Sequence, residues 1–186
     1  ADDDPERAVA CAIEMQNALV AVNAEQRRLK LPELAMGIGI NTGEAVVGNI
    51  GSEQRASYGA VGTPINAAYR IESFTVGGQI LISPSTYEKV QSRVSIIGTK
   101  EVKFKGLDEP VRLYDVAGIS GTYQVFLPEK EAVPLTRLNP PLPVECFPVE
   151  GKTVTDTAIA GRITHLGENS AEVFLDEKLS DYTNLR

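Results

Sequence analysis

The sequence predicts an α+β fold, in which helices alternate with short strands that are joined by tight turns. A long amphipathic helical pattern opens the chain, and two shorter helical segments follow, each with a proline at its start. Several short apolar runs end in glycine-rich turns, which is typical of hairpin strands rather than of a doubly wound parallel sheet. The 186 residues are 42% hydrophobic and 23% charged, which is enough apolar material for a folded core.

The first helix is expected from Pro5 to about Lys30. Asp4 stands at the N-cap position and Pro5 at the first helical position, where its missing N–H is harmless. Pro32 is expected to end the helix. Because the chain starts almost directly with this helix, we expect it to be an N-terminally truncated piece of a longer protein.

Residues 34–41 and 44–50 predict two strands, which a turn at Thr42 and Gly43 would join into an antiparallel hairpin. Residues 51–55 would form a polar turn. A short strand then leads to the next helix.

That helix spans residues 63–75, with Thr63 as its cap and Pro64 at its first position. At 100° per residue, Asn66, Arg70 and Ser73 fall on one narrow polar stripe of a largely apolar helix. The pattern therefore presents an amide and a guanidinium, one turn apart, in one direction.

Residues 79–83 predict a short buried strand, and Ser83 would cap a helix that runs from Pro84 to about Gln91. Two further strands are expected near 94–105 and 111–116.

The composition changes after about residue 118, and six of the eleven prolines lie beyond it. We expect residues 119–142 to form a proline-rich linker or arm. Residues 143–186 would then be a small β-rich accessory segment or a truncated second domain. Within them, 158–166 and 170–178 predict a strand pair.

The net charge of −7 disfavours nucleic acid as a partner, because phosphate neutralisation needs a basic face. No apolar run approaches the length of a membrane span, so no membrane contact is expected from this segment. Cys11 and Cys146 lie far apart, which favours two free thiols in a reducing, cytoplasmic compartment.

Gly37, Gly39 and Gly43 do not have the spacing of a dinucleotide-binding fingerprint, and no helix follows them. Close packing by a neighbouring element explains these glycines better.

Asn66 and Arg70 form the first candidate binding pair, because forked guanidinium donors match phosphate oxygens. The alternative is a surface ion pair between Arg70 and Glu72. Lys103 and Lys105 alternate on a predicted strand and form a second basic feature. They could equally be an edge strand that carries lysines against aggregation.

In sequence order the chain contains PERAVACAIEMQ, MGIGINTGEAVVGNIGSEQRASYGAVGTPINAAYRIES, GGQILISPSTYEKV and VKFKGLDEPVRLYDV. These segments, with their spacings, resemble the class III adenylate and guanylate cyclase catalytic domain over residues 1 to about 117. The resemblance implies a partial catalytic domain over residues 1–118. Its sheet would be the ferredoxin-like-derived cyclase sheet with flanking helices, without the N-terminal strands.

The family implies conversion of ATP or GTP to the 3′,5′-cyclic nucleotide plus pyrophosphate in signal transduction. Its active site lies between two cyclase domains, so a homodimer is expected in the parent protein. By motif, Asn66 would orient the ribose, Arg70 would stabilise charge on the α-phosphate, and Lys105 would contact the triphosphate. Gly59 and Ala60 would line the substrate site.

The family holds Mg²⁺ or Mn²⁺ with two aspartates on strands that precede the first helix found here. Asp2, Asp3 and Asp4 occupy the start of that helix and are not those residues. We therefore expect no metal bound in this chain and no turnover by this chain alone. The alternative is a non-catalytic, cyclase-like dimerisation or regulatory module.

Gly59 stands where family members carry a base-selective side chain, so the choice between ATP and GTP stays open. Residues 160–179 are similar in pattern to a strand pair of PilZ-type barrels. They lack the RxxxR and Asp/Asn-x-Ser-x-x-Gly motifs of that family. An accessory β segment is the expectation there, with a cyclic-dinucleotide binder as the alternative.

Overall fold

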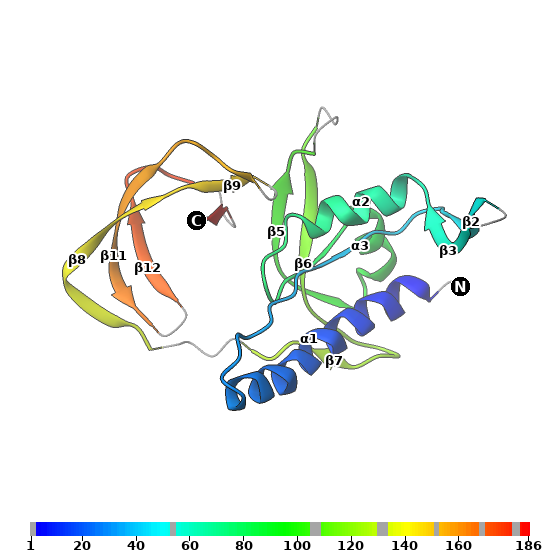
Figure 1. The fold of residues 1–186 in the computed structure, drawn as a ribbon, viewed down its shortest axis with the longest axis horizontal. Helices are drawn as coiled ribbons and strands as arrows, with labels where there is room; N and C mark the ends of the chain where they lie inside the picture. The colour runs from blue at the N-terminus through cyan, green and yellow to red at the C-terminus, as the bar shows by residue number, and fades with distance from the viewer. Residues whose placement is uncertain are drawn as a thin grey trace. The chain divides into compact units, whose positions relative to one another are not determined.

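The computed structural model describes residues 3–52, 55–104, 109–129, 134–150, 153–167, 170–179 and 183–186. The chain divides into two compact units, Ala1–Pro128 and Glu129–Arg186. Both units are drawn in Figure 1. The predicted boundaries at residues 118 and 142 stay a prediction.

The first unit begins with α1 (Asp4–Arg28), which confirms the long helix predicted from the sequence. Its buried side is made by small and branched apolar residues at helical spacing, Val9, Ala10, Ala12 and Ile13. The helix starts one residue earlier than predicted, with Asp3 at the N-cap, and it ends before Pro32. Lys30 adopts a left-handed backbone conformation (φ 57°) just after the last turn.

The sheet of this unit has the order β1-β4-β6-β5 (Figure 1). β1 (Ile38–Ile40) runs parallel to β4 (Ile80–Ile82), and the remaining pairs are antiparallel. β5 (Val94–Val102) and β6 (Val111–Ile119) form the longest pair, and β7 (Val125–Phe126) extends β6. The α+β class predicted from the sequence is confirmed.

Helices cover both faces of this sheet. Ile80 and Ile82 of β4 pack in one core cluster with residues of α1 and with Val90 of α3 (Pro84–Val90). Leu81 points the opposite way and packs in a second cluster with Ile71 of α2 (Thr63–Glu72). The alternation along a fully buried strand therefore fixes α2 on the face opposite α1.

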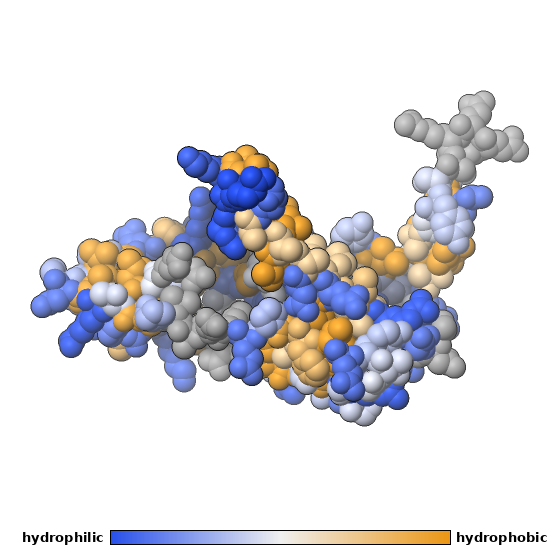
Figure 2. Space-filling view, turned by 90° about the horizontal axis from the view of Figure 1, so that it is seen from below, coloured by the Kyte–Doolittle hydropathy of each residue, from blue (hydrophilic) through white to orange (hydrophobic). Residues whose placement is uncertain are grey.

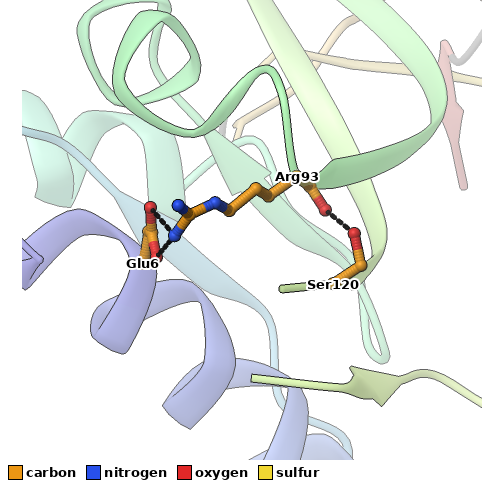
Figure 3. Close-up of polar contacts among 3 residues, drawn as sticks. All are labelled: Glu6, Arg93 and Ser120. Atoms are coloured by element: carbon orange, nitrogen blue, oxygen red, sulfur yellow. Dashed lines mark hydrogen bonds and ion pairs between the residues drawn. The ribbon is translucent and has the colours of Figure 1, made fainter. Parts of the chain in front are cut away.

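α1 is also tied to the connection between α3 and β5 by polar contacts (Figure 3). Arg93 Nη1 donates to both carboxylate oxygens of Glu6, and the backbone oxygen of Arg93 accepts from the Ser120 hydroxyl at 3.0 Å. This cluster links the first turn of α1 to the end of β6.

The predicted hairpin between residues 34–41 and 44–50 is wrong. β1 pairs with β4, whereas β2 (Val46–Ser52) leaves the sheet and pairs with β3 (Arg55–Val61). The reason lies at the end of β1, where the Ile40 oxygen accepts from the Ser83 N–H at 3.0 Å and so continues the ladder to β4. The chain turns away only after Thr42 and Gly43.

The predicted cap of α3 is confirmed. The Ser83 hydroxyl accepts from the Thr86 N–H at 3.1 Å, and Pro84 occupies the first turn. The strand pair β5–β6 is confirmed as well, while the turn predicted between the two strands falls mostly on residues 105–108, outside the described residues.

The second unit contains a sheet of the order β12-β11-β8. β11 (Ile159–Leu166) pairs antiparallel with β12 (Ala171–Leu175), which confirms the predicted strand pair, and with β8 (Thr136–Cys146) on its other side. A second small sheet has the order β10-β9-β13, formed by Thr153–Val154, Pro148–Glu150 and Asn184–Leu185.

Candidate active site

α2 carries the predicted amide and guanidinium. Asn66 and Arg70 are four residues apart on this helix, so they lie on the same side and about one turn apart. Both residues are exposed, whereas Ile71 on the opposite side of the helix is buried in the core. The polar stripe predicted from the sequence thus faces away from the sheet.

The start of α2 differs from the prediction in one respect. Thr63 lies inside the helix, and the N-cap is Gly62, whose φ of 145° strongly favours glycine. Thr63 is therefore not the cap but the first residue of the helix, and the chain enters the helix at Gly62 through a backbone conformation that a residue with a side chain would adopt only with strain. Pro64 does occupy the first turn, as predicted.

Asn41, at the end of β1, holds the first turn of α2 and is itself held by Ser85 in the first turn of α3. Asn41 follows β1, and its amide donates to the Pro64 oxygen at 3.0 Å. Ser85, which follows β4, donates to the Asn41 side-chain oxygen and to the Thr42 backbone oxygen, at 3.2 and 2.9 Å. Sequence reasoning missed Asn41 and Ser85 as positioning residues. No local pattern of the sequence points to either residue, because their contacts join segments that are far apart in the chain.

Two glycines allow α2 to lie directly on the chain beneath it. A Cβ atom on Gly39 would stand 2.4 Å from the Glu72 nitrogen, and one on Gly43 would stand 2.6 Å from the ring of Pro64. Such distances leave no room for a side chain. The close-packing interpretation of the glycine-rich segment is therefore confirmed at both positions.

The C-terminal end of α2 is held by its own C-cap residue, Ser73, and by Lys100 of β5. Ser73 Oγ donates to the Arg70 oxygen at 2.7 Å, and Lys100 Nζ donates to the Phe74 oxygen at 3.3 Å. Burial lowers the pKa of Lys100, while the nearby carboxylate of Asp115 acts in the opposite direction. Both ends of the helix that carries Asn66 and Arg70 are thus fixed by hydrogen bonds.

β2 and β3 form a two-stranded arm, and β3 leads directly into the N-terminal end of α2. Gly59 and Ala60 lie on β3, opposite Gly48 and Val47 in the register. The arm exposes large apolar side chains, and Figure 2 shows hydrophobic surface on it near the body of the unit. These residues are Val46, Val47, Ile50, Tyr58 and Val61. An apolar surface on a projecting arm is typical of an interface.

Lys105, the third predicted substrate-binding residue, lies outside the described residues, so its position relative to α2 is not given by the structure. Lys103 is exposed just beyond the end of β5. The structure therefore brings Asn66 and Arg70 together on α2 and places Gly59 and Ala60 on the strand that precedes this helix.

The polar pair on α2, Asn66 and Arg70, does not have the chemistry of a divalent-cation site. Asn66 supplies one amide oxygen, and the adjacent Arg70 is permanently cationic. Within the described ranges, no group of three or more His, Cys, Asp or Glu side chains could hold a metal ion. Among these same residues, no helix is long and apolar enough to span a bilayer.

The helix-flanked α+β sheet of the first unit is the fold of the nucleotide cyclases. Residues 2–118 match the family described as the adenylate and guanylate cyclase catalytic domain, and the chain belongs to this family.

Two solved structures share this fold. The guanylyl cyclase Cya2 is 54% identical, with a TM-score of 0.65 over 68% of this chain and 64% of that chain. The adenylyl cyclase CyaB from P. aeruginosa is 31% identical, with a TM-score of 0.59 over 66% of this chain and 63% of that chain.

Among curated proteins, adenylate cyclase 1 of Rhizobium meliloti (strain 1021) is 34% identical over 116 residues, which are 61% of this chain and 17% of that protein. Adenylate cyclase of Anabaena cylindrica is 35% identical over 124 residues, 62% of this chain and 25% of that protein. The chain thus spans a quarter or less of these two relatives.

Proposed function

We propose that residues 1–118 contribute one half of a class III cyclase active site, which converts ATP or GTP to the 3′,5′-cyclic nucleotide and pyrophosphate. The observation that carries this proposal is the exposed pair Asn66 and Arg70 on α2, whose first turn accepts a hydrogen bond from Asn41 and whose C-terminal side is tied to β5 through the bond from Lys100 to Phe74. Membership of the cyclase family supports the reaction class.

In this proposal Asn66 hydrogen-bonds the ribose and keeps its 3′ oxygen directed at the α-phosphate. Arg70 donates to the α-phosphate oxygens as negative charge builds there during the attack. A fixed cation that is positioned before the reaction stabilises the transition state without reorganisation, which is worth roughly 10²–10³ in rate. Lys105 would contact the triphosphate, and Gly59 and Ala60 would line the base side of the site.

A second cyclase domain completes the site, and a second copy of this domain is the partner we propose. The apolar arm supports this, because residues such as Tyr58, with 76% of its surface exposed, are rarely left uncovered in clusters. If two copies paired through this arm, the second copy would lie beside β3. Because β3 leads directly into α2, the second copy would then be close to Asn66 and Arg70.

Mg²⁺ or Mn²⁺ would be supplied by the part of the complete enzyme that carries the two aspartates of the family. Those aspartates have no counterpart by motif in these 186 residues, so we propose that the chain on its own does not turn over. No role in metal binding is assigned to Asn66 or Arg70.

A chimera tests the proposal. Residues 2–118 of this chain replace the matching segment of the guanylyl cyclase Cya2, and cyclic GMP and cyclic AMP are measured after supplying GTP or ATP with Mg²⁺ or Mn²⁺. We expect turnover by the chimera and a loss of about 10²–10³ in rate for Arg70→Ala. Asn66→Ala should also lower the rate.

Arg27→Ala is the matched control, because Arg27 is an exposed arginine at the end of α1 that pairs with Glu33. This control should keep the activity of the unsubstituted chimera. If Arg70→Ala unfolds the chimera, or leaves its rate within a few-fold, Arg70 is not the group that stabilises the transition state.

A further inference from the structure

The second unit contains a pocket of ≈ 610 Å³ on the sheet formed by β8, β11 and β12. Its polar and aromatic lining comes from all three strands: Arg137, Asn139, Thr164, His165, Glu172 and Phe174. The volume lies within the range of sites for small ligands. Neither the cyclase reaction nor the site on α2 uses these residues.

A large bulge in β8 forms one wall of this pocket. Leu142 pairs with Ile163 and Arg137 pairs with His165, so the four residues 138–141 lie opposite the single residue Thr164. Extra residues on one strand bend that strand away from its partner and redirect its side chains. Asn139 lies within this bulge and lines the hollow that the bend creates.

The register places the charged and aromatic groups on one face of the sheet. Glu172 and Arg137 both lie opposite His165, and Phe174 lies opposite Arg162. Directly opposed residues share a face, and Glu172 and Phe174 are two positions apart on β12. One face therefore carries an aromatic ring, an acid–imidazole pair and two guanidinium groups.

Glu172 is the one acid among the described residues that line the pocket, and it is already engaged. His165 Nδ1 contacts Glu172 Oε2, and Thr164 Oγ1 donates to the same carboxylate oxygen at 3.2 Å. Among the described residues, Arg137 and Arg162 make no ion pair and no side-chain hydrogen bond. The pocket thus contains the Arg137 guanidinium with no side-chain acceptor among the described residues, which favours an anionic ligand, and phosphate matches its forked geometry. Arg162 lies on the same face of the sheet but is not part of the pocket lining.

The phenyl ring of Phe174 narrows the class of ligand further. Phe174 is 55% exposed and lines the pocket, so a flat group can lie against its ring. A simple inorganic anion would use only the guanidinium groups. A nucleobase uses the ring by stacking and can exchange hydrogen bonds with the Asn139 amide.

We propose that this pocket binds a nucleoside monophosphate, linear or cyclic, with its phosphate on Arg137 and its base on Phe174. The pocket would make the second unit a nucleotide-binding module in a chain whose first unit belongs to the cyclase family. The inference does not depend on turnover by the first unit.

Calorimetric titration of the full 186-residue chain with AMP, GMP, cyclic AMP and cyclic GMP tests the proposal. We expect saturable binding of at least one of these four, and a loss of about tenfold or more in affinity for Arg137→Ala, because a charged hydrogen bond is removed. Phe174→Ala should weaken binding as well. Asn66→Ala and Arg70→Ala in the first unit should leave this affinity unchanged.

Two control variants keep a folding defect apart from a binding defect. Val173→Ala changes the neighbour of Phe174 on the opposite face of β12, and Arg186→Ala removes an exposed arginine outside the pocket. Both should bind like the unsubstituted chain.

Several results would overturn the proposal. Absence of saturable binding up to millimolar ligand is one, and binding that disappears with Asn66→Ala or Arg70→Ala but survives Arg137→Ala is another. Equal affinity for inorganic phosphate would exclude a role for the base. Much tighter binding of a cyclic dinucleotide would exclude the monophosphate as the ligand class.

Discussion

Arg93 Nη1 lies 2.7 and 2.6 Å from the two carboxylate oxygens of Glu6, and this contact joins residues 87 positions apart in the sequence. Only 17% of the Glu6 side chain is exposed, against 43% for Arg93. The pair is thus partly shielded from water. It anchors the first turn of α1 against the connection between α3 and β5.

We expect a double-mutant cycle of Glu6→Gln and Arg93→Gln to give a coupling free energy of up to about 1 kcal/mol, the upper part of the range for surface pairs. Urea unfolding measures the four free energies. The coupling should shrink at 1 M salt, because screening weakens a partly exposed pair. The exposed pair of Arg28 with Glu25 is the control and should show a smaller coupling.

Gly39→Ala should lower the free energy of unfolding by about 1–3 kcal/mol, because the added Cβ would stand 2.4 Å from the Glu72 backbone and force α2 away. Gly48→Ala is the matched control, since nothing lies within 4 Å of a Cβ there. Its effect should stay within about 0.5 kcal/mol. Equal effects at both sites would show that α2 does not rest on Gly39.

Asn41→Leu should weaken the anchoring of α2, because the Pro64 oxygen loses its amide donor and Ser85 loses an acceptor. We expect a loss of about 1–3 kcal/mol in unfolding free energy. In the Cya2 chimera the same change should lower the maximal rate more than it raises KM, because Asn66 is two residues beyond Pro64. An unchanged rate in a folded chimera would show that this anchor does not position the site.

The lowered pKa of Lys100 predicts that the free energy of unfolding changes with pH in the alkaline range. Burial lowers the pKa of this lysine in the folded protein, so the unfolded chain binds more protons between that lowered value and the ordinary value of about 10.4. The cost of burying the charge is complete below the folded pKa and disappears as the pH rises through this window. Stability from this group therefore increases with pH there.

Urea unfolding across the alkaline range, compared between the unsubstituted chain and Lys100→Met, isolates this contribution. Lys100→Met should lack the increase in unfolding free energy with pH that Lys100 contributes in the unsubstituted chain. Lys89→Met, at an exposed lysine of α3, should keep this increase with pH. The same rise in Lys100→Met would assign it to other groups.

Tyr58→Lys should weaken self-association of the Cya2 chimera, because a charge would enter the apolar surface of the arm. Sedimentation velocity should show a shift toward monomer, with a parallel loss of cyclase activity. Tyr69→Lys is a useful comparison, since Tyr69 is 71% exposed on α2 rather than on the arm. A dimer that is unaffected by Tyr58→Lys would exclude the arm as the interface.

Local patterns predicted most helices and strands of the first unit. The buried run Ile80–Ile82 and the Ser83–Pro84 start of α3 carry strong short-range signals, and both appear as expected. The partner of β1 could not be obtained this way. Thr42 and Gly43 look like a hairpin turn, but the parallel pairing with β4 depends on contacts about forty residues away.

The site was predictable to the extent that it lies on one helix. Asn66 and Arg70 share a face because of helical periodicity alone. Asn41 and Ser85 hold that helix through contacts between distant segments, and no local pattern reveals such contacts. The pocket in the second unit depends in the same way on the mismatched register of β8 and β11.

Gly48 and Gly59 face each other at the third of the seven residue pairs of the arm, counted from Val46 and Val61, so this pair carries no side chains on either strand. Cross-strand side-chain pairs stiffen a two-stranded ribbon, and this position has none. We therefore expect the outer part of the arm to bend more easily at this pair than at pairs that carry side chains. Such a joint would let the arms of two copies adjust to each other as they close.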